Sequence, residues 1–119
     1  MAYYPIFVDL TNRPCLVVGG GRIGLEKVHG LLRAEANITI ISPELIPELR
    51  AMVSREQINH LARKYIPGDI LGYEIVIVAT NDKKMNAEIH TEGRSCNIWV
   101  NSADDASNCD FILPSVVRR

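Results

Sequence analysis

The sequence shows no excess of charge of either sign and no long apolar run. It has 13 Lys and Arg residues against 14 Asp and Glu residues, a formal net charge of −1 over 119 residues. Binding to nucleic acid or to a membrane surface usually depends on a strongly basic patch or tail, so we expect neither partner. No apolar run reaches the roughly 20 residues of a membrane span, and residues 1–10 do not resemble a signal peptide. The composition predicts a cytoplasmic protein.

Metal-ligating residues are too scattered to predict a metal site. The cysteines are Cys15, Cys96 and Cys109, and the histidines are His29, His60 and His90. The cysteines match no zinc or redox spacing, and no two histidines are spaced as paired ligands. We therefore expect buried thiols in a reducing compartment, surface or half-buried histidines, and no metal held by this chain alone.

What the sequence does contain is an alternation of short β-branched runs with helical periods. This pattern predicts an α/β fold, a Rossmann-type doubly wound and mostly parallel sheet in a single domain over residues 1–119. We expect strands at 6–10, 15–19, 37–41, 58–66, 74–80, 97–101 and 110–114, and helices over 22–33, 44–54 and 82–95.

The predicted helices carry local signals of their own. The inner stripe of the helix over 22–33 is Ile23, Val28, Leu31 and Leu32. Arg22 and Glu26 are spaced i, i+4, which favours a surface ion pair. Ser42 can cap a helix that begins near residues 43 and 44. Asn81 or Asp82 can cap the helix over 82–95.

A glycine motif follows the first buried strand. Its residues are Gly19, Gly20, Gly21, Arg22, Ile23 and Gly24. In G-x-G-x-x-G, Gly19 permits the tight turn, Gly21 lets a pyrophosphate approach the backbone, and Gly24 allows close packing of helix on strand. The N-terminus of the following helix supplies N–H groups and partial positive charge for the phosphates. The motif predicts a dinucleotide cofactor.

The end of the second strand leaves the choice between NAD and NADP open. The acidic residue that binds the adenosine ribose is expected about 20 residues after the glycines. Ser42 stands there instead, and Glu44 lies two positions later. Ser42 either binds a ribose hydroxyl or caps a helix, and both interpretations remain open.

Two more loops should meet the glycine turn, because ligands bind outside the carboxyl ends of parallel strands. Thr80 and Asn81, in the loop 80–83, either face the nicotinamide-side ribose or form a helix cap. In the loop 101–108, a carboxylate of Asp104 or Asp105 could take a proton from a substrate. Composition alone favours a solvated turn at that point.

Three stretches, in order, resemble one known family. They are "YYPIFVDLTNRPCLVVGGGRIGLEKVHGLL", "IVIVATNDKKMN" and "WVNSADDASNCDFILPSVV". All three are similar to the precorrin-2 dehydrogenases, the NAD-dependent module of siroheme synthase. The resemblance spans essentially the whole chain. It implies oxidation of the tetrapyrrole precorrin-2 to sirohydrochlorin with hydride transfer to NAD, and some members also insert ferrous iron.

The resemblance also assigns residues. The turn from Gly19 to Gly24 corresponds to the pyrophosphate site, and Arg22, Ile23, Pro43 and Glu44 match positions that contact the dinucleotide. Asp104 falls on the catalytic aspartate, preceded by Asn101 as in the family's N-x-x-D pattern. Asp104 is thus the catalytic candidate, rather than Asp105.

The chain departs from the family at several points. Gly24 replaces a usual Ala, Glu26 replaces a basic residue, and Ser102 and Ala103 replace two larger apolar residues. Family members also continue past the equivalent of Arg119 into a segment that forms the dimer and much of the tetrapyrrole pocket. We therefore expect a homodimer formed through that segment and NAD binding by the present residues. Whether they turn over precorrin-2 alone is left open, and a non-catalytic NAD(P)-binding regulatory module is the alternative.

Overall fold

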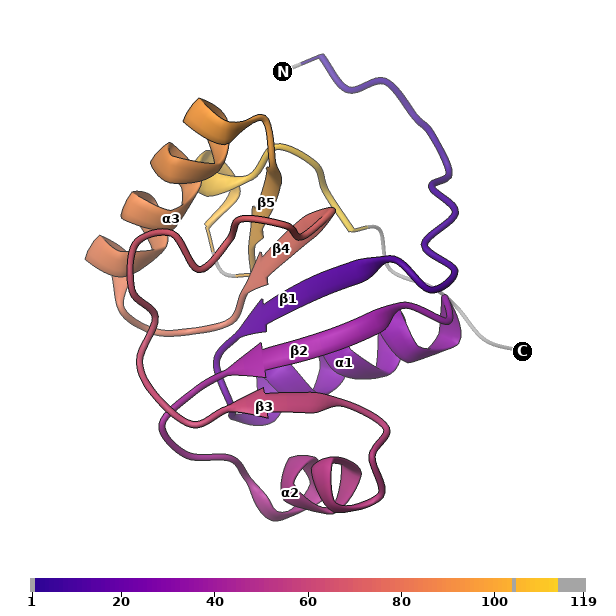
Figure 1. Ribbon diagram of the computed structural model, residues 1–119. Helices are drawn as coiled ribbons and strands as arrows, with labels where there is room; N and C mark the ends of the chain where they lie inside the picture. The colour runs from indigo at the N-terminus through magenta and orange to yellow at the C-terminus, as the bar shows by residue number, and fades with distance from the viewer. Residues whose placement is uncertain (1, 104, 114–119) are drawn as a thin grey trace.

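A five-stranded sheet forms the centre of the computed structural model, which describes residues 2–103 and 105–113 (Figure 1). The strands are β1 (Pro14–Val18), β2 (Asn37–Ile41), β3 (Asn59–Leu61), β4 (Ile75–Val78) and β5 (Trp99–Ser102). All neighbouring strands pair in parallel, in the order β3-β2-β1-β4-β5. The helices are α1 (Arg22–Arg33), α2 (Pro47–Ser54), α3 (Lys83–Cys96) and the short 3-10 helix η1 (Ala106–Asn108). The predicted α/β, doubly wound sheet is confirmed.

Both faces of the sheet are covered, which explains why β1 and β4 are uninterrupted apolar runs. Alternate residues of a strand point to opposite faces. Cys15 and Val17 accordingly pack in the cluster that contains the apolar stripes of α1 and α2. Leu16 and Val18 pack in a second cluster with Ile89 of α3. In Figure 1, α1 lies beside β1 and β2, whereas α3 lies beside the β4–β5 side of the sheet.

Helix α1 has the predicted bounds but a different inner face. Val28 and Leu31 are buried as expected, together with Gly24 and Leu25, whereas Ile23 is 47% exposed. The buried face of the helix therefore begins at Gly24 and not at the predicted Ile23. The expected pair of Arg22 with Glu26 does not form, since Arg22 Nη1 lies 2.9 Å from Glu48 Oε2 in the first turn of α2.

Helix α2 begins three residues later than predicted, and Ser42 does not cap it. Its N-cap is Ile46, with Pro47 at the first helical position and no side-chain cap. The preceding residues instead run across the glycine turn, where the N–H of Ile46 donates to the carbonyl of Gly20 (3.0 Å). Because of this tertiary contact, α2 begins only at Pro47. The proline and capping signals of the sequence do not reveal such a contact.

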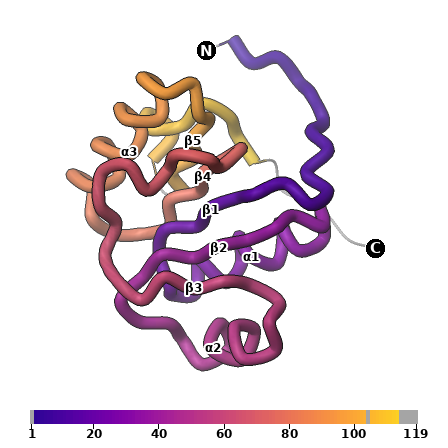
Figure 2. Tube along the Cα trace, viewed as in Figure 1, coloured from indigo at the N-terminus to yellow at the C-terminus, as the bar shows by residue number. Residues whose placement is uncertain are grey.

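Two predicted strands are absent from the described residues. Residues 6–10 pair with no strand, and Phe7 is fully exposed at 104%; Figure 2 shows this N-terminal segment leading away from the sheet. Residues 110–113 of the predicted strand 110–114 are also irregular. Strand alternation alone is therefore insufficient, because a strand forms only where the segment pairs with a neighbouring strand. The strand predicted at 58–66 shortens to β3.

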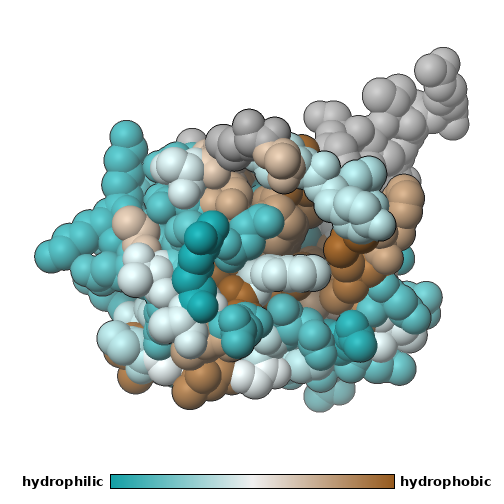
Figure 3. Space-filling model, turned by 90° about the horizontal axis from the view of Figure 1, so that it is seen from above, coloured by the Kyte–Doolittle hydropathy of each residue, from teal (hydrophilic) through white to brown (hydrophobic). Residues whose placement is uncertain are grey.

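Several apolar side chains are exposed at the surface. The exposed apolar side chains include Tyr4, Phe7, Ile112 and Leu113, and Figure 3 shows brown apolar atoms between hydrophilic ones on the face seen from above.

Only Cys15 is buried, whereas Cys96 is exposed and Cys109 is half-buried, so the prediction of buried thiols is wrong for Cys96. Within residues 2–103 and 105–113, none of the helices has the length and apolar character to cross a membrane.

Candidate functional site

The carboxyl ends of the five strands are joined by backbone hydrogen bonds at one edge of the sheet. With the donor first, these are Ser42 to Leu61 (3.2 Å), Gly19 to Ile41 (3.0 Å), Ala79 to Val18 (2.7 Å) and Ala103 to Val78 (2.9 Å). The chain winds from β1 outward to β3 and from β4 outward to β5, so its direction reverses between β1 and β4. Such a switch point is where open α/β sheets bind their ligands.

The glycine turn packs against the loops on both sides of the switch point. Gly19 has φ = +123°, which L side chains rarely adopt, and a Cβ there would overlap the carbonyl of Ala79. A Cβ on Gly20 would overlap the carbonyl of Glu44 and lie 2.7 Å from Ser42 Oγ. A Cβ on Gly24 would overlap the carbonyl of Gly19. These three glycines are therefore required by close packing.

Gly21 differs from the other glycines of the turn, because nothing lies within 4 Å of the position of a Cβ on it. It is the N-cap of α1, and no side chain caps the helix. In the described part of the chain, no acceptor takes the N–H groups of Arg22, Ile23 and Gly24. Open space beside unpaired N–H groups at a helix N-terminus fits a phosphate. The residues present thus fit the pyrophosphate of a dinucleotide.

The segment after β2 lies next to this turn. Ser42 is buried, and its hydroxyl donates to the carbonyl of Glu44 (2.6 Å) rather than capping a helix. His60 Nε2, from β3, lies 2.8 Å from the carbonyl oxygen of Ser42. Pro43, Glu44, Arg50 and His60 line a groove of about 560 Å³ at this end of the sheet. His60 was not predicted here, and only the parallel pairing of β2 with β3 brings it close.

A buried amide holds the loop after β4. Thr80 Oγ1 donates to Asn86 Oδ1 (2.6 Å), and Asn86 Nδ2 donates to the carbonyl of Thr80 (3.0 Å). Asp82 caps α3 by accepting from the N–H of Met85 (3.0 Å), which confirms one of the two predicted caps. Asn81 is exposed beside them. Sequence reasoning missed Asn86, although a polar residue one turn before Ile89 on the inner face of a helix is a usable signal.

The loop after β5 contains the proposed catalytic position. Asp104 lies outside the described residues, but both of its chain neighbours are held by backbone bonds: Ala103 N–H to Val78 and Asp105 N–H to Ser102 (3.3 Å). The Asp105 carboxylate accepts from the backbone N–H (3.0 Å) and the hydroxyl (2.6 Å) of Ser107. These hydrogen bonds, aided by the charge of Lys83, keep the pKa of Asp105 below its usual value. Asp105 therefore has the role of a turn residue, as predicted.

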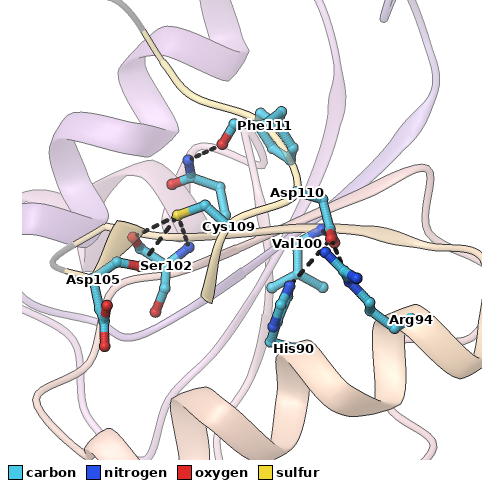
Figure 4. Close-up of polar contacts among 9 residues, drawn as sticks. His90, Arg94, Val100, Ser102, Asp105, Cys109, Asp110 and Phe111 are labelled. Atoms are coloured by element: carbon cyan, nitrogen blue, oxygen red, sulfur yellow. Dashed lines mark hydrogen bonds and ion pairs between the residues drawn. The ribbon is translucent and has the colours of Figure 1, made fainter. Parts of the chain in front are cut away.

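Further contacts close this loop, as Figure 4 shows. Asn101 Nδ2 donates to the carbonyl of Phe111 (2.9 Å). Cys109 Sγ accepts from the N–H of Ser102 (3.2 Å). The buried hydroxyl of Ser102 has no hydrogen-bond partner within the described residues. No group of three or more His, Cys, Asp or Glu residues in the described ranges could hold a metal ion.

A doubly wound sheet with an open helix N-terminus at its switch point defines a Rossmann-type dinucleotide-binding domain. The comparison with protein families agrees: a model described as "Putative NAD(P)-binding" matches residues 6–115. The chain belongs to this family, and its cofactor is a nicotinamide dinucleotide.

Relatives extend the likeness along the whole chain. The siroheme synthase of Methylobacillus flagellatus is 44% identical over 119 residues, which are all of this chain and 26% of that protein. The siroheme synthase of Blochmanniella pennsylvanica is 42% identical over 119 residues, which are 25% of that protein. The chain spans about a quarter of the length of these relatives. Among solved structures, SirC, a precorrin-2 dehydrogenase, matches with a TM-score of 0.80 and 28% identity, over 98% of this chain and 57% of that one.

Proposed function

We propose that this domain serves the NAD-dependent dehydrogenation of precorrin-2 to sirohydrochlorin in siroheme biosynthesis. One observation carries the proposal: the likeness to the precorrin-2 dehydrogenase SirC extends over 98% of the chain. It therefore includes both the glycine turn and the loop after β5. The siroheme synthase relatives, which cover the whole chain, support the same pathway.

The placement of the three loops supports the roles that we propose. Gly21 and the N-terminus of α1 hold the pyrophosphate, with Arg22 and Ile23 beside it, and Ser42, Pro43 and Glu44 lie on the adenosine side. Thr80, fixed by Asn86, and Asn81 lie on the nicotinamide side. A nicotinamide dinucleotide held by these residues would supply the acceptor for the hydride that the reduced macrocycle loses. We assign to Asp104 the removal of the accompanying proton, so that two electrons and two hydrogens leave the substrate.

NAD rather than NADP is the proposed acceptor. Rossmann domains that take NADP usually place an arginine near the adenosine ribose to bind its 2′-phosphate. Here Arg22 is paired with Glu48 (2.9 Å), and Arg50 Nη1 donates to the carbonyl of Leu45 (3.1 Å). Arg22 and Arg50, two cations near the segment after β2, therefore already have partners, and the Glu44 carboxylate nearby disfavours a phosphate.

The proposal also covers the compartment, the oligomeric state and the substrate. We assign the protein to the cytoplasm and expect a homodimer, with no nucleic-acid partner. The substrate is the tetrapyrrole precorrin-2, which carries many carboxylates.

The test measures cofactor binding and turnover separately. The chain is titrated with NAD and NADP by calorimetry, and formation of NADH is followed by absorbance after precorrin-2 is added. We expect tighter binding of NAD and NADH formation that depends on precorrin-2. Asp104→Asn should abolish turnover with nearly unchanged NAD affinity, whereas the matched control Asp105→Asn should retain turnover.

Other outcomes would contradict parts of the proposal. Full activity of Asp104→Asn would remove Asp104 as the base. Saturable NAD binding without any NADH formation would favour a non-catalytic regulatory module. Absence of dinucleotide binding would favour a purely structural role.

A further inference from the structure

Asp110, in the segment after β5, has a carboxylate with three hydrogen-bond partners. Its Oδ1 lies 3.1 Å from His90 Nε2 and 3.1 Å from Arg94 Nε, and its Oδ2 accepts from the N–H of Val100 (2.9 Å). Its own N–H donates to the carbonyl of Val100 (2.8 Å). The carboxylate is nearly buried, with 11% of the side chain exposed. Figure 4 shows it between β5 and the two side chains that rise from α3.

These contacts close a loop at its base. The two bonds between Asp110 and Val100 join strand β5 to the segment that returns alongside it. Cys109 Sγ adds a second closure, because it bonds to the N–H and the carbonyl of Ser102 (both 3.2 Å). The segment between these closures includes Ala103 and Asp105, the chain neighbours of Asp104. Its two ends are therefore tied to the carboxyl end of β5.

Helix α3 gives the loop its second anchor. His90 and Arg94 lie one turn apart on α3 and share Oδ1 of Asp110. The helix itself sits tightly on β5, since a Cβ on Gly93 would lie 2.5 Å from Cγ2 of Val100 in that strand. The bond from the charged Arg94 guanidinium to the carboxylate is of a class that is stronger than bonds between neutral groups. The position of the loop is thus coupled to that of the rigid sheet and helix.

We propose that Asp110 is a positioning residue for the dehydrogenation, which rests on the proposed function. Within the described residues, its hydrogen bonds reach His90, Arg94 and Val100 and not the glycine turn or the loop after β4, so it acts by fixing the loop that carries Asp104. Loosening this loop lowers kcat and leaves the affinity for NAD intact. In well-ordered sites, a misplacement of about 1 Å can cost about 100-fold in rate.

The chain offers a matched control in Asp69. This carboxylate also has 11% of its side chain exposed, accepts from an arginine (Arg63, 2.6 and 2.9 Å) and accepts from a backbone N–H (Ile66, 2.7 Å). It lies in the loop between β3 and β4, outside the proposed machinery. Replacing Asp69 disturbs a similar number of bonds, so it separates loss of stability from loss of loop position.

The experiment compares Asp110→Ala, Asp110→Asn and Asp69→Ala for kcat, KM for NAD and thermal midpoint. We expect kcat to fall roughly 10- to 100-fold in Asp110→Ala, and less in Asp110→Asn, whose amide oxygen can still accept from Val100. KM for NAD should change less than about twofold in both. Asp69→Ala should lower the midpoint comparably and keep kcat. Unchanged kcat in Asp110→Ala, or an equal fall in Asp69→Ala, would overturn the proposal.

A second readout separates this proposal from the proposed function. Amide hydrogen exchange is measured for the backbone of residues 100–110 in each variant. We expect faster exchange there in Asp110→Ala and wild-type protection in Asp69→Ala. A wild-type chain that binds no dinucleotide contradicts the proposed function. Unchanged protection in Asp110→Ala contradicts the closure of the loop, and with it the positioning role, whatever the activity.

Discussion

Thr80 and Asn86 hold each other through two hydrogen bonds. One joins the Thr80 hydroxyl to Asn86 Oδ1 (2.6 Å), and the other joins Asn86 Nδ2 to the carbonyl of Thr80 (3.0 Å). Asn86 is only 1% exposed. The pair fixes the first residues after β4 to the first turn of α3, next to the glycine turn. The shape of the loop that we propose to face the nicotinamide therefore depends on a side chain of the helix.

Asn86→Ala is predicted to destabilise the domain and to weaken NAD binding. A buried polar group left without its partner costs about 1–3 kcal/mol, and here the Thr80 carbonyl loses its donor. Urea unfolding measures the loss of stability, and calorimetry measures the affinity. Asn81→Ala is the control, because this exposed neighbour should leave the free energy of unfolding within about 0.5 kcal/mol of the wild type. Unchanged stability of Asn86→Ala would contradict the importance of the pair.

Gly21→Ala is predicted to weaken NAD binding without destabilising the fold. Nothing lies within 4 Å of the added Cβ in the protein, but the methyl group would occupy the space through which the pyrophosphate approaches the helix. We expect the affinity for NAD to fall at least about tenfold, or about 1.4 kcal/mol.

Gly30→Ala on the same helix is the control for that change. Its Cβ would meet only the end of Arg33 at 3.9 Å. Replacement of an interior helix glycine by alanine should stabilise α1 by about 0.5–1 kcal/mol and leave NAD affinity unchanged. If Gly21→Ala binds NAD as well as Gly30→Ala does, the pyrophosphate does not lie against Gly21.

The parts of the fold that depend on local signals could be predicted from the sequence. Helix α1 (Arg22–Arg33) and strand β2 (Asn37–Ile41) have the predicted bounds, because helical periodicity and a β-branched run are properties of the segment itself. The position of the glycine turn could also be predicted, since the sequence shows the motif between a buried strand and a helix.

The rest depends on contacts between distant segments. Residues 6–10 alternate like a strand but pair with no strand of the sheet, and α2 begins at Pro47 because the preceding residues cross Gly20. Similarly, Asp110 bonds to His90 across 20 residues of chain. No spacing rule joins such pairs, so the closure of the loop after β5 was beyond sequence reasoning.

The stabilisation provided by Asp69 is predicted to depend on pH. Hydrogen bonds from Arg63, and secondarily from the N–H of Ile66, lower the pKa of Asp69 below its ordinary value of 3.8. A carboxyl with a lowered pKa in the folded state stabilises that state above its unfolded pKa, and this contribution disappears as pH falls through the folded pKa. The free energy of unfolding of the wild type should exceed that of Asp69→Asn at neutral pH.

Urea unfolding at a series of pH values checks this prediction. The difference between wild type and Asp69→Asn should be constant down to about pH 5, shrink below 3.8 and vanish at lower pH. Glu74→Gln, which removes an exposed carboxylate 4.0 Å from Arg13, should change stability little at any pH. A difference that grows as the pH falls would have the wrong sign and would contradict the assignment.

The three thiols are predicted to react at different rates. Cys15 is fully buried, and burial, followed by the charge of Glu74, raises its pKa to about 11, so it remains a protonated, inaccessible thiol near neutral pH. Cys96 is exposed, and Cys109 is half-buried with its sulfur bonded to Ser102. A disulfide reagent at about pH 8 should therefore modify Cys96 rapidly, Cys109 slowly, and Cys15 only after unfolding. Cys96→Ser should remove the fast phase and Cys109→Ser the slow one, whereas a fast thiol in the Cys96→Ser variant would show that the loop after β5 opens readily.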